Sequence, residues 1–196
     1  MKEFRTEKRK NKIISVAKSR QNSLSVILEN IHDPHNVSAI FRTCDAVGVP
    51  KVGLIYNIEK FPKIGKKSSA SAFKWVEKEK FDSVKGCYDE LHNNGFKIYA
   101  SSLTGEAKSL YELDLTGKVA IVLGNEHRGV SDEAAQMADQ VFLIPMHGMV
   151  QSLNVSVAAA VILYEAMRQR TEKGLYEKSY LDDTAIETMI ENWSKK

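Results

Sequence analysis

The sequence predicts an α/β protein with a parallel sheet flanked by helices, and three observations lead to this prediction. Apolar runs alternate with segments of helical periodicity along most of the chain. Most of these runs are continuous, which is typical of strands buried on both faces. The length of 196 residues, with 43% hydrophobic and 27% charged residues, suits one globular domain with short extensions.

Six segments have the length and apolar character of strands, and turn-forming or polar residues bound them. Five are short apolar runs, and one, at 75–81, alternates between apolar and charged residues. The expected strands are 24–31, 51–56, 75–81, 96–101, 119–123 and 141–144.

Four segments between or after these strands have helical periodicity: 36–47, 83–94, 131–138 and 154–170. Asn36 and Ser38 fit a helix start, and Ser131 fits a helix cap. Gly48 and Gly95 fit helix stops.

The two ends of the chain differ from this pattern and predict short helical extensions. Residues 1–20 fit a basic helix with sparse apolar positions. Residues 184–193 fit a short amphipathic helix, which we expect to pack on the body of the protein. We therefore expect an N-terminal extension at 1–20, a main domain at 21–171 and a C-terminal extension at 172–196.

The charges are distributed unevenly and favour a polyanionic partner. Residues 1–20 hold eight Lys or Arg and two Glu, and residues 60–80 hold seven Lys and two Glu. Residues 81–165 hold five basic and eleven acidic residues. Two basic segments on a locally acidic body indicate nucleic-acid contact at chosen places, although solvated charged loops would give the same pattern.

Composition argues against several classes of protein. The two cysteines, Cys44 and Cys87, are far apart and outside any Cys/His cluster, so we expect no disulfide scaffold and no metal site. The charged start of the chain does not fit a signal peptide, and no apolar run has the length of a membrane span. We expect a cytoplasmic protein.

Ligands bind at the carboxyl ends of strands in sheets of this kind, so unusual residues at strand ends are candidate sites. The first such segment, at 35–42, reads HNVSAIFR, and the second, at 123–131, reads LGNEHRGVS. Each is also compatible with an ordinary strand-to-helix connection. Neither matches a dinucleotide-binding or P-loop pattern.

The third segment, at 144–156, reads IPMHGMVQSLNVS and is unusual for a loop. Met146, Met149, Val150 and Leu153 are apolar, whereas loops are normally polar. We expect this loop to be covered by a ligand, a partner subunit or another loop.

Together, HNVSAIFRTCDAVGV, LGNEHRGVS and IPMHGMVQSLNVSVAAAVILYEAMRQR resemble the three motifs of the SPOUT-superfamily RNA 2′-O-ribose methyltransferases. The resemblance covers about residues 22–170 and is nearest to the TrmH type, which methylates a guanosine ribose in the D-loop of tRNA. It implies a deep C-terminal trefoil knot, which is a rare exception to the usual topology rules. It also implies S-adenosylmethionine as cofactor and a homodimer that packs through the 154–170 helix.

The resemblance also implies the site residues. The active-site positions are Asn36, Arg42, Glu126 and Asn154, with Ser152 beside them. The positions that contact the cofactor are Ser101, Gly124, Ile144, Leu153 and Met149. The positions expected to contact RNA are Arg168, Arg170, Lys66, Lys67 and Arg9.

The role of Arg42 stays open between a base and an electrostatic group. Neutralising an arginine near pH 7 costs roughly 7–8 kcal/mol, so a guanidinium that places the phosphate and stabilises the developing alkoxide is the less costly role. Arg168 and Arg170 are also explained by the dipole at a helix C-terminus. We expect tRNA as substrate; the alternatives are ribosomal RNA and a non-catalytic RNA-binding or assembly factor.

Overall fold

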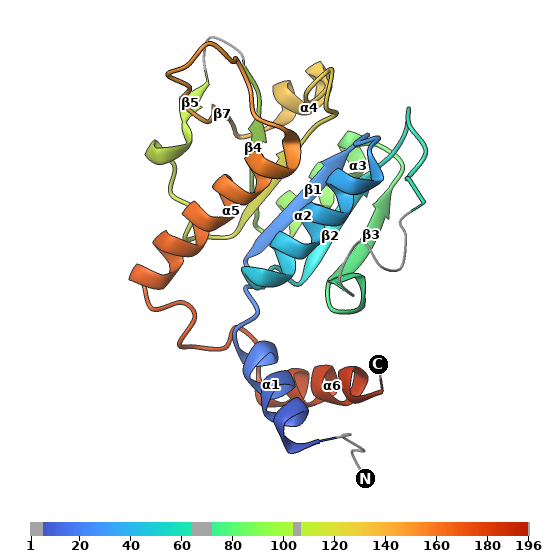
Figure 1. Cartoon of the computed structure of the whole chain (residues 1–196), viewed down its shortest axis with the longest axis vertical. Coiled ribbons are helices and arrows are strands. Elements are labelled where there is room, and N and C mark those ends of the chain that lie inside the picture. The colour runs from blue at the N-terminus through green and yellow to red at the C-terminus, as the bar shows by residue number, and fades with distance from the viewer. Residues whose placement is uncertain (1–5, 64–71, 104–106, 196) are drawn as a thin grey trace.

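The structure is a computed structural model that describes residues 6–63, 72–103 and 107–195. Its described part contains one seven-stranded sheet, and every neighbouring pair of strands is parallel (Figure 1). The strand order is β3-β2-β1-β6-β4-β7-β5. The strands are β1 (Leu24–Glu29), β2 (Lys51–Ile55), β3 (Glu77–Phe81), β4 (Lys97–Ser101), β5 (Lys108–Ser109), β6 (Val119–Leu123) and β7 (Gln140–Leu143).

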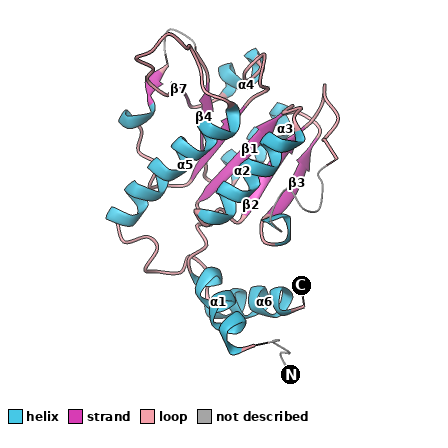
Figure 2. Cartoon of the chain, in the orientation of Figure 1, coloured by secondary structure: helices cyan, strands magenta, loops and turns pink. Residues whose placement is uncertain are grey.

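Helices cover both faces of this sheet (Figure 2). One apolar core lies between the sheet and helices α2 and α5, and a second lies between the sheet and helices α3 and α4. Both faces of the central strands are therefore buried, which explains their continuous apolar sequences. The helices are α1 (Glu7–Lys18), α2 (Pro34–Ala46), α3 (Val84–Asn93), α4 (Asp132–Met137), α5 (Val155–Glu172) and α6 (Asp183–Ser194), with 3-10 turns η1 (Ala72–Lys74) and η2 (Leu110–Glu112).

The predicted α/β class is confirmed, and the main differences are the start of helix α2 and one additional strand, β5. Helix α2 begins at Pro34 rather than Asn36, because the Asp33 side chain caps the helix by accepting from the N–H of His35. A proline suits the first helical position because it lacks the N–H that would be unpaired there. Strand β5 was not predicted, since two residues are too few to show a period.

The two terminal helices, α1 and α6, pack on each other at one end of the molecule (Figure 1). Ile13 and Ala17 meet Ile186 and Ile190 in a small separate core. The expectation that the C-terminal helix packs on the body holds only in part, because its main partner is α1. These helices form a small unit beside the amino ends of the strands.

The buried guanidinium of Arg20 joins this unit to the main domain. It lies 5.1 Å from the ring centre of Trp193 on α6. It also donates to the Asp45 carboxylate at 2.7 Å and to the carbonyl oxygens of Val49 and Trp75, both at 3.1 Å. A fully buried arginine needs such partners, because an unpaired buried charge is strongly destabilising.

The expectation that Arg170 contacts RNA is wrong, because its side chain is fully buried. The guanidinium donates to the carbonyl oxygens of Leu115, Ser23 and Gly117 and to the side chains of Ser23 and Gln21. Burial lowers its pKa. Arg170 therefore ties the end of α5 to the starts of β1 and β6.

No helix in the described ranges combines the length and the apolar character needed to cross a bilayer.

Candidate active site

The three motif segments meet at one edge of the sheet. The first begins just after β1, the second after β6 and the third after β7. Strands β1 and β6 are neighbours, and β4 separates β6 from β7. Since the carboxyl ends of parallel strands share one edge, the topology brings segments from distant parts of the sequence together there.

Hydrogen bonds between side chains link the three segments directly. The Asn36 Nδ2 atom donates to Glu126 Oε1 at 2.9 Å, and Asn36 Oδ1 accepts from Asn154 Nδ2 at 3.1 Å. Asn154 is also the cap of α5, because its Oδ1 accepts from the N–H of Ser156 at 2.9 Å. We call Glu126, Asn36 and Asn154 the polar chain. It joins one residue from each motif.

Glu126 has the environment of a fixed, ionised carboxylate. It accepts from the backbone N–H groups of His32 and Asp33, each at 3.1 Å, as well as from Asn36. Partial burial by itself raises the pKa of Glu126, but these hydrogen bonds outweigh it and lower the pKa overall. At neutral pH the carboxylate therefore acts as an acceptor that fixes the start of α2.

The turn that carries Glu126 depends on a very close backbone contact. A Cβ atom on Gly124 would lie 2.1 Å from the carbonyl carbon of Gly129 and 2.1 Å from the nitrogen of Val130. Gly129 has φ of 71°, and its N–H donates to the carbonyl oxygen of Asn125 at 2.8 Å. The Asn125 side chain donates to the Asn30 carbonyl at 2.8 Å. Glycine at 124 thus allows the turn to fold back on its own start at the end of β6.

Arg42 and Ser152 are placed differently from the polar chain. Arg42 is exposed on α2, six residues beyond Asn36, which corresponds to about 9 Å along the helix. No hydrogen bond or ion pair joins the Arg42 guanidinium to another described residue. Ser152 is exposed in the loop before Asn154. The structure therefore unites three of the five predicted catalytic residues by direct contact.

The residues predicted to contact the cofactor cluster at neighbouring strand ends. Ser101 ends β4, Gly124 follows β6 and Ile144 follows β7, while Leu153 directly precedes the cap of α5. Ile144 and Leu153 are partly buried, whereas Met149 is fully exposed. Backbone groups and apolar side chains of this kind suit the adenosyl group of the cofactor. The residues present fit S-adenosylmethionine.

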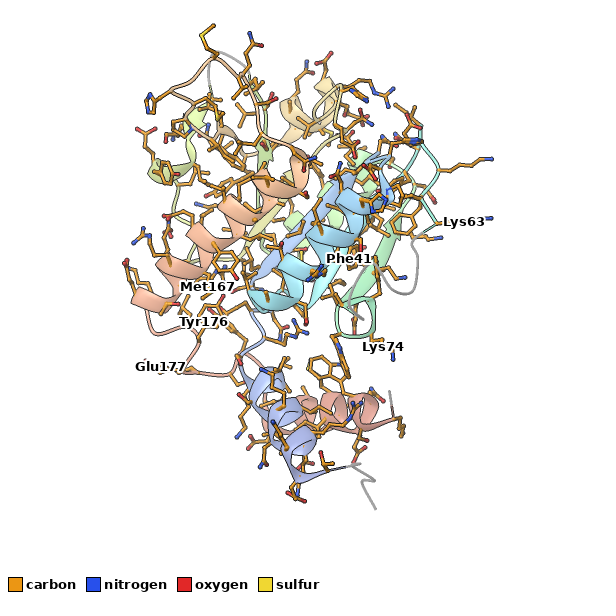
Figure 3. The ribbon with its side chains drawn as sticks, in the orientation of Figure 1. Phe41, Lys63, Lys74, Met167, Tyr176 and Glu177 are labelled. Atoms are coloured by element: carbon orange, nitrogen blue, oxygen red, sulfur yellow. The ribbon has the colours of Figure 1, made fainter. Side chains whose placement is uncertain are left out.

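The residues predicted to contact RNA have mixed surroundings. Arg168 is half-exposed, and its guanidinium pairs with Glu165 at 2.8 Å and with Glu172 at 2.6 Å, which raises its pKa. Arg9 on α1 lies 5.9 Å from the ring centre of Trp75. Lys66 and Lys67 lie outside the described residues. Lys63, before that gap, projects outward at the margin of the molecule (Figure 3).

Sequence reasoning missed the residues that support the polar chain. Asp33 caps α2, and the dipeptide Asp33-Pro34 is the signal by which the helix start was predictable. Asn30 has φ of 52° and directly follows β1, and its buried partner Asn125 holds the second motif. No local pattern predicts that pair, because 95 residues separate the two asparagines.

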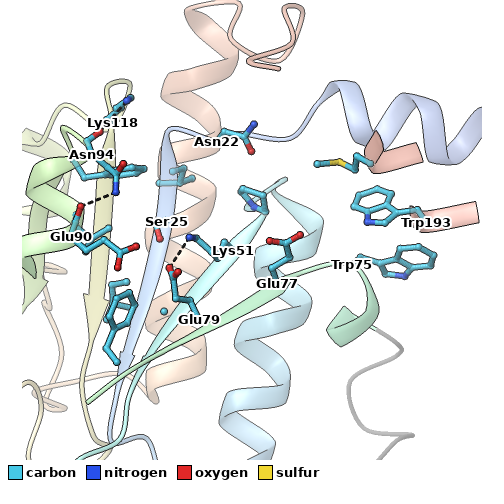
Figure 4. Close-up of a pocket in the computed structure, with 18 residues that line it drawn as sticks. Asn22, Ser25, Lys51, Trp75, Glu77, Glu79, Glu90, Asn94, Lys118 and Trp193 are labelled. Atoms are coloured by element: carbon cyan, nitrogen blue, oxygen red, sulfur yellow. Dashed lines mark hydrogen bonds and ion pairs between the residues drawn. The ribbon is translucent and has the colours of Figure 1, made fainter. Parts of the chain in front are cut away.

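A separate hollow of about 350 Å³ lies at the amino ends of β1 and β2 and along β3, beside α3 and α6 (Figure 4). Its walls carry the Lys51–Glu79 ion pair at 2.6 Å and the rings of Trp75 and Trp193. It is remote from the polar chain. In the described residues, no group of three or more His, Cys, Asp or Glu is placed to hold a metal ion.

A parallel α/β sheet with a polar site at its carboxyl edge is typical of an enzyme. Comparison with known proteins identifies the family. Residues 23–164 match the model of the SpoU rRNA Methylase family. The chain belongs to this family.

Particular relatives resemble it along almost its whole length. The tRNA (guanosine(18)-2′-O)-methyltransferase of Thermus thermophilus is 44% identical over 192 residues, covering 98% of each chain. The crystal structure of the Aquifex aeolicus TrmH/SpoU tRNA modifying enzyme has a TM-score of 0.90 at 42% identity and covers 96% of each chain.

A more distant structure was solved with a cofactor. It is the SpoU methyltransferase AviRb from Streptomyces viridochromogenes in complex with AdoMet. It is 26% identical with a TM-score of 0.70, and the match covers 78% of this chain and 62% of that one.

Proposed function

We propose that this chain transfers a methyl group from S-adenosylmethionine to the ribose 2′-OH of guanosine 18 in tRNA. The observation that carries the proposal is the polar chain, which joins Glu126, Asn36 and Asn154 at the strand ends of a SpoU fold. The near-complete match to a tRNA (guanosine(18)-2′-O)-methyltransferase supports guanosine 18 as the target. The intact site argues against a non-catalytic binding factor.

Ribosomal RNA is the second candidate substrate, because the family model is named for rRNA methylases. The tRNA reading is favoured because the match to the Thermus tRNA enzyme covers 98% of both chains, including the terminal helices. Helices α1 and α6 lie outside residues 23–164, the part that the family model describes. The similarity to the tRNA enzyme therefore extends to segments that the family model does not cover.

We assign the cofactor to Ser101, Gly124, Ile144, Leu153 and Met149, which lie at or beyond the ends of β4, β6 and β7. S-adenosylmethionine supplies an electrophilic methyl group when bound. The protein's task is then alignment, because a well-oriented nucleophile supplies much of the rate enhancement for such a transfer. We also propose a deep trefoil knot in the part of the chain around 144–153, as the resemblance to the SPOUT methyltransferases implies.

In this mechanism the polar chain holds the three motif segments in place, and Arg42 provides a positive charge. Glu126 stays ionised and holds the first turn of α2 through Asn36 and two backbone N–H groups. Asn154 fixes the start of α5 to the same point. Arg42, free of other described partners, keeps its guanidinium available for the RNA phosphate and the developing 2′-alkoxide. Ser152 lies in the loop beside this site.

We further propose a homodimer that packs through α5. Val157 and Tyr164 are about half-exposed and, with Val161 between them, form an apolar stripe at i, i+4 and i+7 on the outer side of the helix. The loop before the helix exposes Met149 completely and Val150 by 62%. An exposed apolar surface of this kind fits a two-fold interface. Analytical ultracentrifugation tests it, and a monomer at micromolar concentration would refute it.

We assign catalysis to residues 21–171, and RNA contact outside the site to the N-terminal extension at 1–20, the basic segment at 60–80 and the end of α5. The C-terminal extension at 172–196 carries more acidic than basic residues and is not assigned to RNA contact. Arg9 and Arg168 are the described residues proposed for this contact, and Lys66 and Lys67 lie in a segment that the structure leaves out. We propose a cytoplasmic location, which suits a reaction on tRNA.

The deciding experiment measures transfer of tritiated methyl from S-adenosylmethionine to unmodified tRNA and, separately, to unmodified ribosomal RNA. Digestion of the product and identification of the nucleoside should give 2′-O-methylguanosine from tRNA alone. A tRNA in which guanosine 18 is replaced by adenosine serves as the matched control and should take no label. Label in ribosomal RNA alone would show that ribosomal RNA, and not tRNA, is the substrate. No label in either RNA would refute the enzyme assignment.

A further inference from the structure

A second charged cluster lies directly beside the polar chain. The Arg128 guanidinium pairs with Glu59 Oε1 at 2.9 Å, and the His32 Nδ1 atom lies 3.6 Å from Glu59 Oε2. The backbone N–H of His32 donates to Glu126 at 3.1 Å. One residue thus touches both the carboxylate of the polar chain and the carboxylate of the cluster.

Each member of the cluster is held by its backbone, independently of the ion pair. The N–H groups of Ile58 and Glu59 donate to the Asn30 side chain at 3.1 and 3.0 Å. The N–H of Arg128 donates to the Asn125 side chain at 3.3 Å, within the turn that Gly124 allows. Removing the charge of Glu59 should therefore leave Arg128 in place.

The cluster faces solvent, so another anion can replace Glu59 as the partner of Arg128. The side chains of Arg128 and His32 are 55% and 76% exposed, and that of Glu59 is 28% exposed. Exposed ion pairs contribute little to stability, so another anion can replace the carboxylate. A guanidinium binds phosphate with the same two-pronged geometry with which it binds carboxylate.

We propose that Arg128, with His32 beside it, binds a phosphate of the RNA substrate, and that Glu59 occupies this phosphate site in the RNA-free protein. This inference rests on the proposed function, since it needs an RNA strand at the edge of the sheet. It makes Glu59 a competitor of the substrate. Its removal should strengthen RNA binding, whereas removal of Arg128 should weaken it.

The test measures binding of unmodified tRNA at several salt concentrations for the wild type, E59Q, R128Q and the double variant. R128Q should weaken binding about 5- to 10-fold and lower the salt slope by about one, as expected for one lost phosphate contact. E59Q should strengthen binding about 2- to 5-fold, which corresponds to the release of one exposed ion pair. The double variant should bind like R128Q.

The matched control is K51Q, which removes the cation from the partly exposed Lys51–Glu79 pair at the start of β2, at the opposite edge of the sheet. It should change tRNA binding by less than 2-fold. Binding of S-adenosylmethionine should also be unchanged in R128Q. A loss of cofactor binding would assign Arg128 to the cofactor carboxylate and overturn the inference.

Opposite shifts for E59Q and R128Q support the proposal. Equal weakening by both variants would show that the pair only tethers the loop after β2, and wild-type binding by either variant would also overturn the proposal. Methyl transfer by the wild type to the same tRNA is measured in parallel. If that transfer is absent, the proposed function fails; if it is present without the opposite shifts, only the inference fails.

Discussion

Replacing Gly124 by alanine gives the sharpest test of how the second motif is built. The added Cβ would lie 2.1 Å from Gly129 and Val130, and the atoms it meets belong to the backbone. Atoms in van der Waals contact stay more than about 3.4 Å apart, so the turn has to move by more than 1 Å. No rotation of a side chain relieves this clash.

The expected cost of G124A is about 3 kcal/mol, the upper part of the range for overpacked sites. For a protein of this size it corresponds to a Tm lower by roughly 6–12 °C. The displaced turn carries Glu126 and lies beside the proposed cofactor position. We therefore expect G124A to lose S-adenosylmethionine binding in calorimetry as well as stability in thermal unfolding.

Gly117 provides the matched control, because a Cβ there meets no atom within 4 Å. G117A should retain cofactor binding and keep or slightly raise Tm, since alanine reduces the entropy of the unfolded chain. If G124A binds the cofactor and melts like the wild type, the close backbone contact at Gly124 is not what fixes the turn that carries Glu126.

Three further changes test other parts of the molecule. R42A should abolish methyl transfer while S-adenosylmethionine binding stays within a few-fold of wild type by calorimetry; equal activity would remove Arg42 from the mechanism. R170M should lower the free energy of unfolding in urea by about 3 kcal/mol, because buried carbonyl oxygens lose their donor; unchanged stability with weakened tRNA binding would restore an RNA-contact role. The lowered pKa of Glu126 means that its ionised form stabilises the fold at pH values above the ordinary carboxyl range, and that this contribution is lost as the pH falls through the lowered pKa. The urea midpoint of E126Q should therefore fall less steeply in acid than that of the wild type, and parallel curves would contradict this reading.

Local sequence signals predicted the elements well where one signal dominates. The apolar run of β6 has the same bounds in the sequence and in the structure, and Ser83 and Ser131 cap α3 and α4 as ordinary helix caps do. The start of α2 was misplaced because two cap signals compete there. Asp33 before a proline prevails over Asn36, whose side chain is used in the polar chain instead.

The residues of the polar chain could be predicted from the sequence, but the contacts between them could not. Asn36 bonds to a residue 90 positions later and accepts from one 118 positions later, and no periodicity encodes such pairs. The burial of Arg170 was also not predictable from local sequence. A basic residue near a helix end is normally exposed, but here the chain turns back and β1 and β6 cover it.

The long sequence separations in the sheet also have a consequence for the speed and order of folding. β1 pairs with β6, whose first residue Val119 lies opposite Leu24, and the polar chain closes only when Asn154 arrives. Closing loops of about a hundred residues is entropically costly, and contacts of this range make folding slow. Strands β1 and β2 and helix α2 can associate early from nearby sequence. The methyl-transfer site is then among the last parts to assemble, so a collapsed intermediate with near-native helix content should be unable to bind the cofactor.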